Sequence, residues 1–285
     1  MTNRDVIEKI LAHHPDLGKD YRGCDEFKAG NPDDKCTGVV SALVPTVEVI
    51  RKTAEQGCNL LVTHEVISYQ TPDFPDWKGA FPNRVYEEKQ RLLKQTGITV
   101  WRDHDHMHAH KPDSIFTGVI RYMGWEKYYQ PTEEPFTYPI TLPETTVGEL
   151  ARHIKEKLGL NGLRYLGRDS DKISRIALVG HIYPNSFIPD GMEKDGSYRD
   201  YSMEVIRLME EQGVQAILPG EIIEWTVLSY IRDGIALGKP MAMYNIGHFN
   251  WEELGMKYAA EWIRELVGDE LPVHYVPTGD MYSFV

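Results

Sequence analysis

Cysteine is scarce in this sequence of 285 residues, and long apolar runs are missing from it. The three cysteines form no Cys-x-x-Cys pair, and an odd number does not complete a disulfide framework, which argues against a disulfide-stapled secreted domain. No run approaches the roughly 20 apolar residues of a membrane-spanning helix, and the N-terminus has no signal-peptide core. These absences predict a reduced, cytoplasmic protein with no membrane segment.

Positive charge is also in short supply. Lysine and arginine number 31 against 43 acidic residues, for a net charge of −12, so a phosphate backbone would be repelled and nucleic acid is a poor partner. The hydrophobic fraction of 41% is ample for packed cores. We therefore expect a globular protein of one large or two ordinary domains.

Apolar periodicity predicts that helices and strands alternate, which is typical of the α/β class with largely parallel sheets. The strand at 273–276 could join either of two sheets. A stretch rich in proline, threonine and glutamate, 130–143, is expected to link two lobes, and 180–199 to be a long loop. The predicted helices cover 46–56, 84–96, 202–212, 222–237 and 250–267, and the other predicted strands cover 59–63, 98–101, 173–179, 214–218 and 241–246.

An internal repeat supports two lobes. Residues 46–65 align with 202–221 without a gap and share eight of 20 residues, where about one is expected by chance. Two amphipathic helices that each end in glycine could look alike by composition alone. However, both aligned segments also end in glutamate, and in both a further helix and strand follow in the same order. We predict two related, duplicated α/β lobes with parallel or mixed sheets flanked by helices. The first lobe is 1–129, with 247–285 returning to the site, and the second is 130–246.

Three groups of polar residues follow predicted strands, where open α/β folds bind ligands. The first is His64-Glu65. It is not the zinc-protease helix motif, because that motif needs a histidine where Ser68 stands. The pair could instead ligate metal, or simply be a polar pair at a strand end.

The second group is a histidine tract at 103–110. If this segment is extended, its alternating histidines all lie on one face, and a bound cation would keep the four crowded rings neutral. The alternative is a solvated, histidine-rich loop. The four are His104, His106, His108 and His110.

The third group follows the strand at 241–246. Asn250 is expected to cap the next helix, which would place Glu252 in the first helical turn and His248 on the preceding loop. Both side chains could then face one point beyond the sheet edge. A histidine and a glutamate at this spacing are by themselves weak evidence for a metal site. Together with the other two groups they form a candidate set of metal ligands.

In combination, these motifs resemble the NGG-interacting-factor-three-like family, whose members are often described as type two homologues of GTP cyclohydrolase I. The resemblance implies a duplicated α/β fold, a dinuclear metal site between the lobes and toroidal homohexamers. Its motifs are Pro45-Thr46, Val62-Thr63-His64, Gly220-Glu221, Gly247-His248 and Glu252.

The resemblance also implies a ligand set. His64, His248 and Glu252 match family ligands, and His104 matches an earlier family histidine. Two positions depart from the pattern: Glu65 stands where a second histidine is usual, and His108 where aspartate is usual. The metal ligands predicted in this way are His64, Glu65, His104, His108, His248 and Glu252.

The predicted function is a hydrolase with two divalent ions per chain, of zinc, iron, manganese or nickel, acting on a small phosphorylated or nucleotide-like substrate. A metal-bridged hydroxide would attack, with Glu65 and Glu252 as catalytic residues. The alternative is a non-enzymatic metal-binding scaffold, metal carrier or partner-binding ring. We also expect a homo-oligomer, from the family resemblance and from an apparently exposed aromatic stretch at 128–138.

Overall fold

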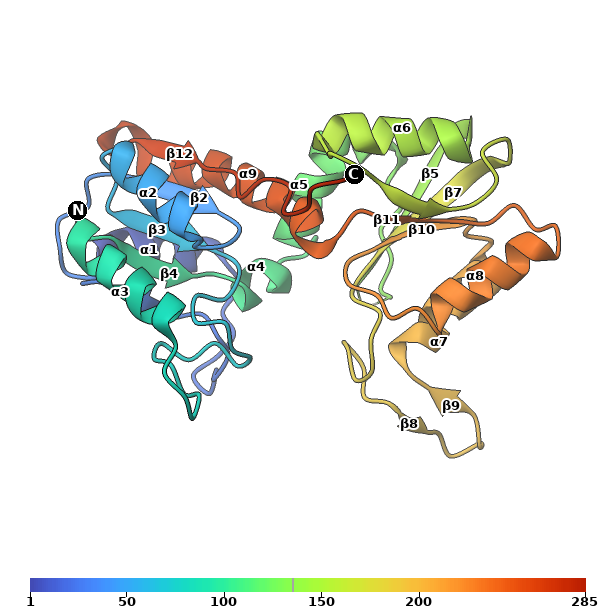
Figure 1. Cartoon of the computed structure of the whole chain (residues 1–285), viewed down its shortest axis with the longest axis horizontal. Helices are drawn as coiled ribbons and strands as arrows, with labels where there is room; N and C mark the ends of the chain where they lie inside the picture. Colours follow the sequence, from blue (N-terminus) through green and yellow to red (C-terminus); the bar gives the residue numbers. More distant parts are fainter. Residues whose placement is uncertain (135) are drawn as a thin grey trace. The chain divides into compact units, whose positions relative to one another are not determined.

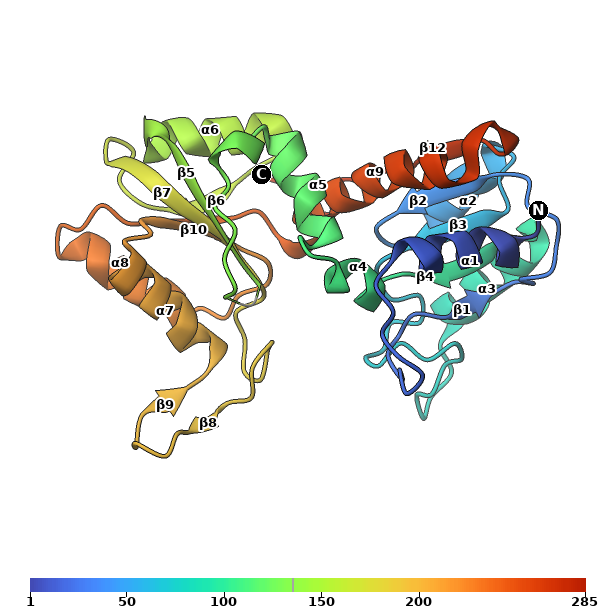
Figure 2. The same cartoon turned by 180° about the vertical axis from the view of Figure 1, so that it is seen from behind.

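The chain forms two compact units. The computed structural model describes residues 1–134 and 136–285. Unit 1 comprises residues 1–119 and 252–279, and unit 2 comprises residues 120–251 and 280–285. Figures 1 and 2 show their elements from two opposite sides.

Unit 1 is built on a five-stranded sheet in the order β1-β4-β3-β2-β12. Strands β12, β2, β3 and β4 run parallel, and β1 closes the β4 edge in the antiparallel direction. The last strand therefore joins the first sheet rather than the second. The elements are α1 (Asn3–His13), β1 (Phe27–Ala29), β2 (Val39–Ala42), α2 (Val47–Glu55), β3 (Leu60–Thr63), α3 (Arg84–Thr96), β4 (Thr99–Arg102), α4 (Asp105–Ala109), the first part of α5 (Ser114–Met123), η2 (Gly268–Glu270) and β12 (Val273–Tyr275).

Helices cover both faces of this sheet. On one face, Val40 and Leu61 pack with Ile50 of α2 and Leu93 of α3 in an apolar core. On the other face, the Ser41 hydroxyl of β2 donates a 2.7 Å hydrogen bond to a backbone carbonyl of helix α9 (His248–Val267). Because helices cover both faces of the sheet, every residue of β2, β3 and β4 is buried.

Unit 2 has its own five-stranded sheet, in the order β5-β7-β10-β11-β6. The three central strands run parallel, and β5 and β6 are antiparallel to their neighbours at the two edges. The elements are η1 (Glu126–Tyr128), β5 (Thr137–Thr146), α6 (Val147–Leu158), β6 (Arg164–Leu166), β7 (Lys172–Val179), the paired β8 (Gly191–Met192) and β9 (Tyr198–Arg199), α7 (Tyr201–Gln212), β10 (Ala216–Pro219), α8 (Val227–Ala236) and β11 (Ala242–Asn245).

The helices of unit 2 also lie on two sides of the sheet. Val205 of α7 and Ile231 of α8 share a core with Ile217 of β10. On the opposite face, the Tyr244 hydroxyl of β11 donates to the carbonyl of Val147 at the start of α6, at 2.9 Å. Figure 1 shows α6 across the sheet from α7 and α8. The predicted α/β class, with two mixed sheets flanked by helices, is confirmed.

Several predicted segments differ in the structure. The segment 130–143 is not all linker, because β5 begins at Thr137 and pairs with β7. Helix α8 begins at Val227 rather than at 222, since Ile182 and Ile222 form a bridge that keeps the preceding chain extended. The predicted loop at 180–199 contains the short β8–β9 pair. Across residues 1–134 and 136–285, no helix is long and apolar enough to cross a membrane.

The aromatic stretch that suggested an exposed interface is partly covered within unit 2. Tyr138 is buried, and Phe136 packs against the core that α7 and α8 share. Phe136 also lies 4.0 Å, centroid to centroid, from the ring of Phe187. These two side chains therefore give no support to an oligomer interface.

Candidate metal centre

His64 follows β3 directly and is fully buried. Its backbone N–H and that of Glu65 both donate to the carbonyl of Leu43, which fixes the chain where β3 ends beside β2. The His64 Nδ1 atom lies 3.0 Å from the carbonyl oxygen of Asp103. Because a carbonyl only accepts, Nδ1 carries the proton and Nε2 keeps its lone pair.

The histidine tract is a short helix, so the predicted extended chain with four rings on one face is wrong. Asp25 accepts hydrogen bonds from the backbone N–H groups of His104, Asp105 and His106, which holds the segment in the turn that opens α4. Asp25 is about 80 residues away in the sequence, and the tract itself contains no sign of this contact.

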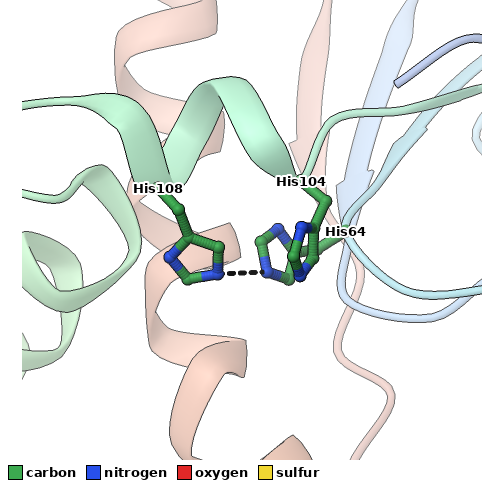
Figure 3. Close-up of side chains that lie close together, drawn as sticks. All are labelled: His64, His104 and His108. Carbon is green, nitrogen blue, oxygen red and sulfur yellow. Dashed lines mark hydrogen bonds between the residues drawn. The ribbon is translucent and has the colours of Figure 1, made fainter. Parts of the chain in front are cut away.

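Helical geometry divides the tract between two faces. His104 and His108, four residues apart, lie with His64, as Figure 3 shows. The ring of His104 stacks on that of His64 with centroids 4.4 Å apart. The Nε2 atoms of His64 and His108 are 3.2 Å apart. His106 and His110 contact different residues.

Each ring on this face is held through Nδ1. His104 Nδ1 lies 2.8 Å from a carboxylate oxygen of Asp105, and His108 Nδ1 lies 2.7 Å from one of Asp113. A carboxylate or carbonyl partner on one ring nitrogen is the usual arrangement of metal-ligating histidines, because it leaves the lone pair of the other nitrogen for the ion. The three imidazoles therefore suit a metal ion.

Two carboxylates complete the group. Glu252 of α9 is buried, and its Oε2 lies 3.5 Å from His64 Nε2. Glu65 is buried beside Arg102, with 3.8 Å between its Oε2 and a guanidinium nitrogen. His64, His104 and His108 offer ligand atoms within 4.8 Å of one another, and so do His64, Glu65 and Glu252. These five residues are called the unit-1 cluster below.

The pKa values of the histidines in the cluster are compatible with a bound cation. Burial and the neighbouring His104 hold the pKa of His64 well below its usual value. Burial also acts to lower the pKa of His108, but Asp113 and Glu252 outweigh it and raise this pKa to about 9. At neutral pH a proton on His108 is therefore shared with the lone pair of His64, and a bound metal ion would take the place of that proton.

Unit 2 contains a second group at the carboxyl ends of its parallel strands. His181 follows β7, Glu221 follows β10 and His248 follows β11, and their ligand atoms lie within 4.8 Å of one another. The backbone N–H of Glu221 donates to His181 Nδ1 at 3.0 Å. A side-chain β-carbon at Gly220 would lie 2.4 Å from the same nitrogen, so glycine is required there. His181 was not predicted as a metal ligand. Like His64, however, it is a histidine that follows a buried strand, so the same criterion applies to it.

The start of α9 differs from the prediction. The helix begins at His248 rather than at Asn250, so His248 lies in the helix and Glu252 falls in its second turn. Asn250 does not serve as a cap, and its side-chain amide instead donates to the carbonyl of Ile246 at 2.9 Å. The expected grouping of His248 with the unit-1 cluster stays a prediction.

A pocket of about 790 Å³ opens beside the unit-2 group. Its wall includes the ends of β10 and β11, the first residues of α9 and the segment 280–284. Arg164 lines it and has no hydrogen-bond or ion-pair partner among residues 1–134 and 136–285. Tyr183, Tyr282 and Phe284, each more than a third exposed, line it too. The pocket therefore offers a cation together with aromatic faces.

Comparison with known proteins identifies the class to which this fold and these histidines belong. Residues 5–181 match the profile of the Duf34/NIF3 (NGG1p interacting factor 3) family, and the chain belongs to that family. The resemblance inferred from the motifs is thereby confirmed, and the chain is a member with candidate histidine and carboxylate metal-binding clusters.

Individual relatives are distant. A Clostridium perfringens (strain 13 / Type A) protein named GTP cyclohydrolase 1 type 2 homolog is 22% identical over 274 residues, which are 94% of this chain and 92% of the relative. A Bacillus cereus protein related to NIF3 has a similar structure, with a TM-score of 0.72 and 14% identity over 100% of this chain and 99% of the other. Staphylococcus aureus protein SA1388 gives a TM-score of 0.70 and 19% identity over the same shares. At these identities the structures establish the fold alone.

Proposed function

We propose that this protein is a metal-dependent hydrolase that holds two divalent ions and acts on a small phosphorylated or nucleotide-like substrate. The observation that carries the proposal is the pair of His64 and His108 Nε2 atoms, 3.2 Å apart and each aimed by a partner on Nδ1. Two imidazole nitrogens fixed this close, with one proton between them, form an arrangement in which a shared metal ion can replace that proton.

The proposed ligands are the unit-1 cluster together with His248, in a site between the two lobes. His248 and Glu252 are four residues apart within α9, a spacing that places side chains on one face of a helix. The mixture of imidazole and carboxylate suits zinc, iron, manganese or nickel. When bound, two such ions would supply Lewis acidity and make hydroxide available at neutral pH.

The chain's own residues would position the substrate and move protons. Arg102 lies 3.8 Å from Glu65 and favours its ionised form, in which the carboxylate can accept a proton from the attacking water. Arg164 would hold the phosphate, and the aromatic side chains at the rim of the unit-2 pocket would stack on a planar ring. This pocket is what favours a phosphorylated, ring-containing substrate.

We also propose that the two units arose by duplication. The repeated sequences fall on α2–β3 in unit 1 and on α7–β10 in unit 2. Strands β2, β3 and β4 correspond in order and direction to β7, β10 and β11, and each set has an antiparallel edge strand beside its last member. The carboxyl ends that carry the two histidine groups are then equivalent positions.

Turnover with a defined metal load tests the hydrolase. Metal-free protein reloaded with zinc or manganese is assayed on bis(p-nitrophenyl) phosphate, p-nitrophenyl phosphate and GTP. We expect metal-dependent release of product, and a loss of about 10²- to 10⁴-fold in kcat for Glu65→Gln when it is compared with wild type at the same metal load. Glu55→Gln, at the exposed end of α2, is the matched control. No turnover of any of the three substrates by the fully loaded protein would contradict the proposal.

A second candidate is a non-enzymatic metal-binding scaffold or metal carrier. The same Arg102–Glu65 contact favours it, since a carboxylate paired with arginine is a weaker base than a free one. In that case Glu65→Gln and Glu252→Gln would alter metal content alone.

A further inference from the structure

The pocket of unit 2 has a composition that narrows the class of ligand it can hold. Its volume of about 790 Å³ lies in the range of pockets that bind small molecules. The residues that line it all belong to 120–251 and 280–285, so the pocket lies within unit 2. Among the residues that the structure describes, this lining contains one arginine, no lysine and two carboxylates. The arginine is Arg164, and the carboxylates are those of Glu221 and Asp280.

Arg164 is positioned by the edge strand of the sheet. It lies on β6 directly opposite Asn245 of β11 in an antiparallel pair, so the two side chains are on the same face of the sheet. Both residues line the pocket. A guanidinium group can donate two parallel hydrogen bonds to the oxygens of one phosphate, and the amide of an asparagine can donate to a neighbouring oxygen. The pair is therefore suited to hold one anionic group.

The charges around the pocket limit how much negative charge a ligand can carry. A phosphate monoester has a charge of about −1.5 to −2 at pH 7, which one arginine can partly neutralise. Each further phosphate would add negative charge where the described lining offers no second arginine or lysine and presents Glu221 and Asp280. The net charge of the chain, −12, adds to this repulsion. The pocket therefore favours a monophosphate over a triphosphate.

The end of the chain supplies an aromatic wall to the same pocket. Tyr282 and Phe284 line it, and the segment that carries them is fixed by Asn161 and Gly162. The backbone N–H of Asn161 donates to Asp280 Oδ2 at 3.0 Å, and its side-chain amide donates to the carbonyl of Tyr282 at 3.1 Å. Phe284 lies so close to Gly162 that a β-carbon there would be 2.6 Å from a ring carbon. The C-terminal segment is thus packed onto unit 2 as part of the pocket.

The aromatic side chains of the pocket are open to a ligand. Tyr282 is 70% exposed, Phe284 49% and Tyr183 39%. Exposed aromatic rings in a binding groove stack on nucleobases, and they do so for every base because each base has a flat face. A sugar phosphate without a base would leave these rings in contact with water. A planar ring is therefore the second requirement for a ligand.

We propose that the unit-2 pocket binds an aromatic compound with a single phosphate, of the nucleoside monophosphate class. Arg164 and Asn245 would contact the phosphate, and Tyr282 and Phe284 would stack on the ring. This inference rests on the proposed function, because it names the class of substrate on which the hydrolase would act. Binding in the pocket uses none of the proposed metal chemistry, so it can be measured separately.

Calorimetric titration of the metal-free full chain in EDTA tests the proposal. The probes are AMP, GMP, ATP, GTP, adenosine and ribose 5-phosphate. We expect AMP or GMP to bind at least about 10-fold more tightly than its triphosphate, adenosine or ribose 5-phosphate. Arg164→Gln should reduce the affinity for the monophosphate by about 10- to 100-fold and should abolish the preference over adenosine. Arg175→Gln is the matched control, because Arg175 is an exposed arginine of β7 outside the pocket.

A second pair of variants tests the aromatic wall. Phe284→Ala should weaken the binding of AMP and GMP by about 10-fold, because one stacking ring is lost, and should leave the binding of ribose 5-phosphate unchanged. Leu237→Ala is the control, since Leu237 is an apolar side chain of the same unit that is 79% exposed and lies outside the pocket. Circular dichroism verifies the fold of all four variants.

The outcomes separate this pocket from the hydrolase. Equal affinity of folded Arg164→Gln and Arg175→Gln for the monophosphates would overturn the proposal, and so would the failure of wild type to bind AMP or GMP. Triphosphates that bind as tightly as the monophosphates would also overturn it. No turnover is measured, so these results leave metal-dependent hydrolysis untouched. Conversely, a protein that binds monophosphates but hydrolyses nothing would support the pocket and contradict the hydrolase.

Discussion

The hydrogen bond on one nitrogen of an imidazole decides what the other nitrogen can do. In this protein Asp105, Asp113 and the carbonyl of Asp103 each bind a histidine Nδ1 of the unit-1 cluster. A histidine–carboxylate pair of this kind that is partly exposed is easily mistaken for a surface ion pair. Here they determine which ring atoms can ligate a metal.

Asp113→Asn isolates this effect. Asp113 Oδ1 also accepts the backbone N–H of Phe116 at the start of α5, and asparagine keeps that hydrogen bond while it removes the charge beside His108. We expect zinc affinity to fall by about 10- to 100-fold, and the free energy of unfolding of the metal-free protein to fall as well, because His108 loses the charge that raises its pKa. Calorimetric zinc titration measures the first and urea unfolding the second. An unchanged zinc affinity would mean that Asp113 serves α5 alone.

A buried lysine gives a prediction for pH. Burial lowers the pKa of Lys89 to about 8, against 10.5 ordinarily, although Asp73 opposes the shift. Between these two values the unfolded chain binds the proton and the folded chain does not, so the free energy of unfolding rises with pH. Relative to Lys89→Met, the wild type should gain up to about 3 kcal/mol between pH 8 and 10.5. Urea unfolding at several pH values measures the difference, and parallel pH profiles would rule out the shift.

Among the elements, regular periodicity gave reliable predictions and long-range contacts did not. Helix α3 matches its predicted range, 84–96, because an asparagine cap and a terminal glycine mark both ends locally. The helical form of the histidine tract could not be predicted, since Asp25, which holds its first turn, is remote in sequence. His64 and Glu252 were identified from sequence and lie together, whereas the partners on Nδ1 and the role of Arg102 needed the fold.

The crossing of α5 and α9 is another feature that only the fold reveals. A β-carbon on Gly118 would lie 2.8 Å from the Cα of Gly255 and from the carbonyl oxygen of Leu254, both backbone atoms. We expect Gly118→Ala to destabilise the protein by about 1 to 3 kcal/mol, since the helices must move apart. Zinc affinity should also fall, because α9 carries Glu252.

Gly191→Ala is the matched control for that change. No atom lies within 4 Å of the β-carbon this substitution would add, so the free energy of unfolding should stay within about 0.5 kcal/mol of wild type. Thermal and urea unfolding compare the two variants. Equal stability of Gly118→Ala and Gly191→Ala would show that the two helices do not pack this closely.

For the whole molecule, self-association remains a prediction. Two of the aromatic side chains that suggested it are covered within unit 2, but Trp225 and Leu237 of the same unit are 72% and 79% exposed. The family resemblance suggests a hexameric ring. Light scattering at micromolar concentration should give a mass well above the 32.7 kDa of one chain. A single species of 32.7 kDa would refute self-association.

Metal content tests the central claim most directly. Wild-type protein and Glu252→Gln, purified without added metal, are compared by elemental analysis, with circular dichroism to verify the fold. Glutamine keeps the shape of Glu252 but removes the charge that lies 3.5 Å from His64. The account predicts bound zinc, iron, manganese or nickel in the wild type and at least one ion fewer per chain in the variant. Equal metal content in two folded proteins, or none in the wild type even after reconstitution, would contradict it.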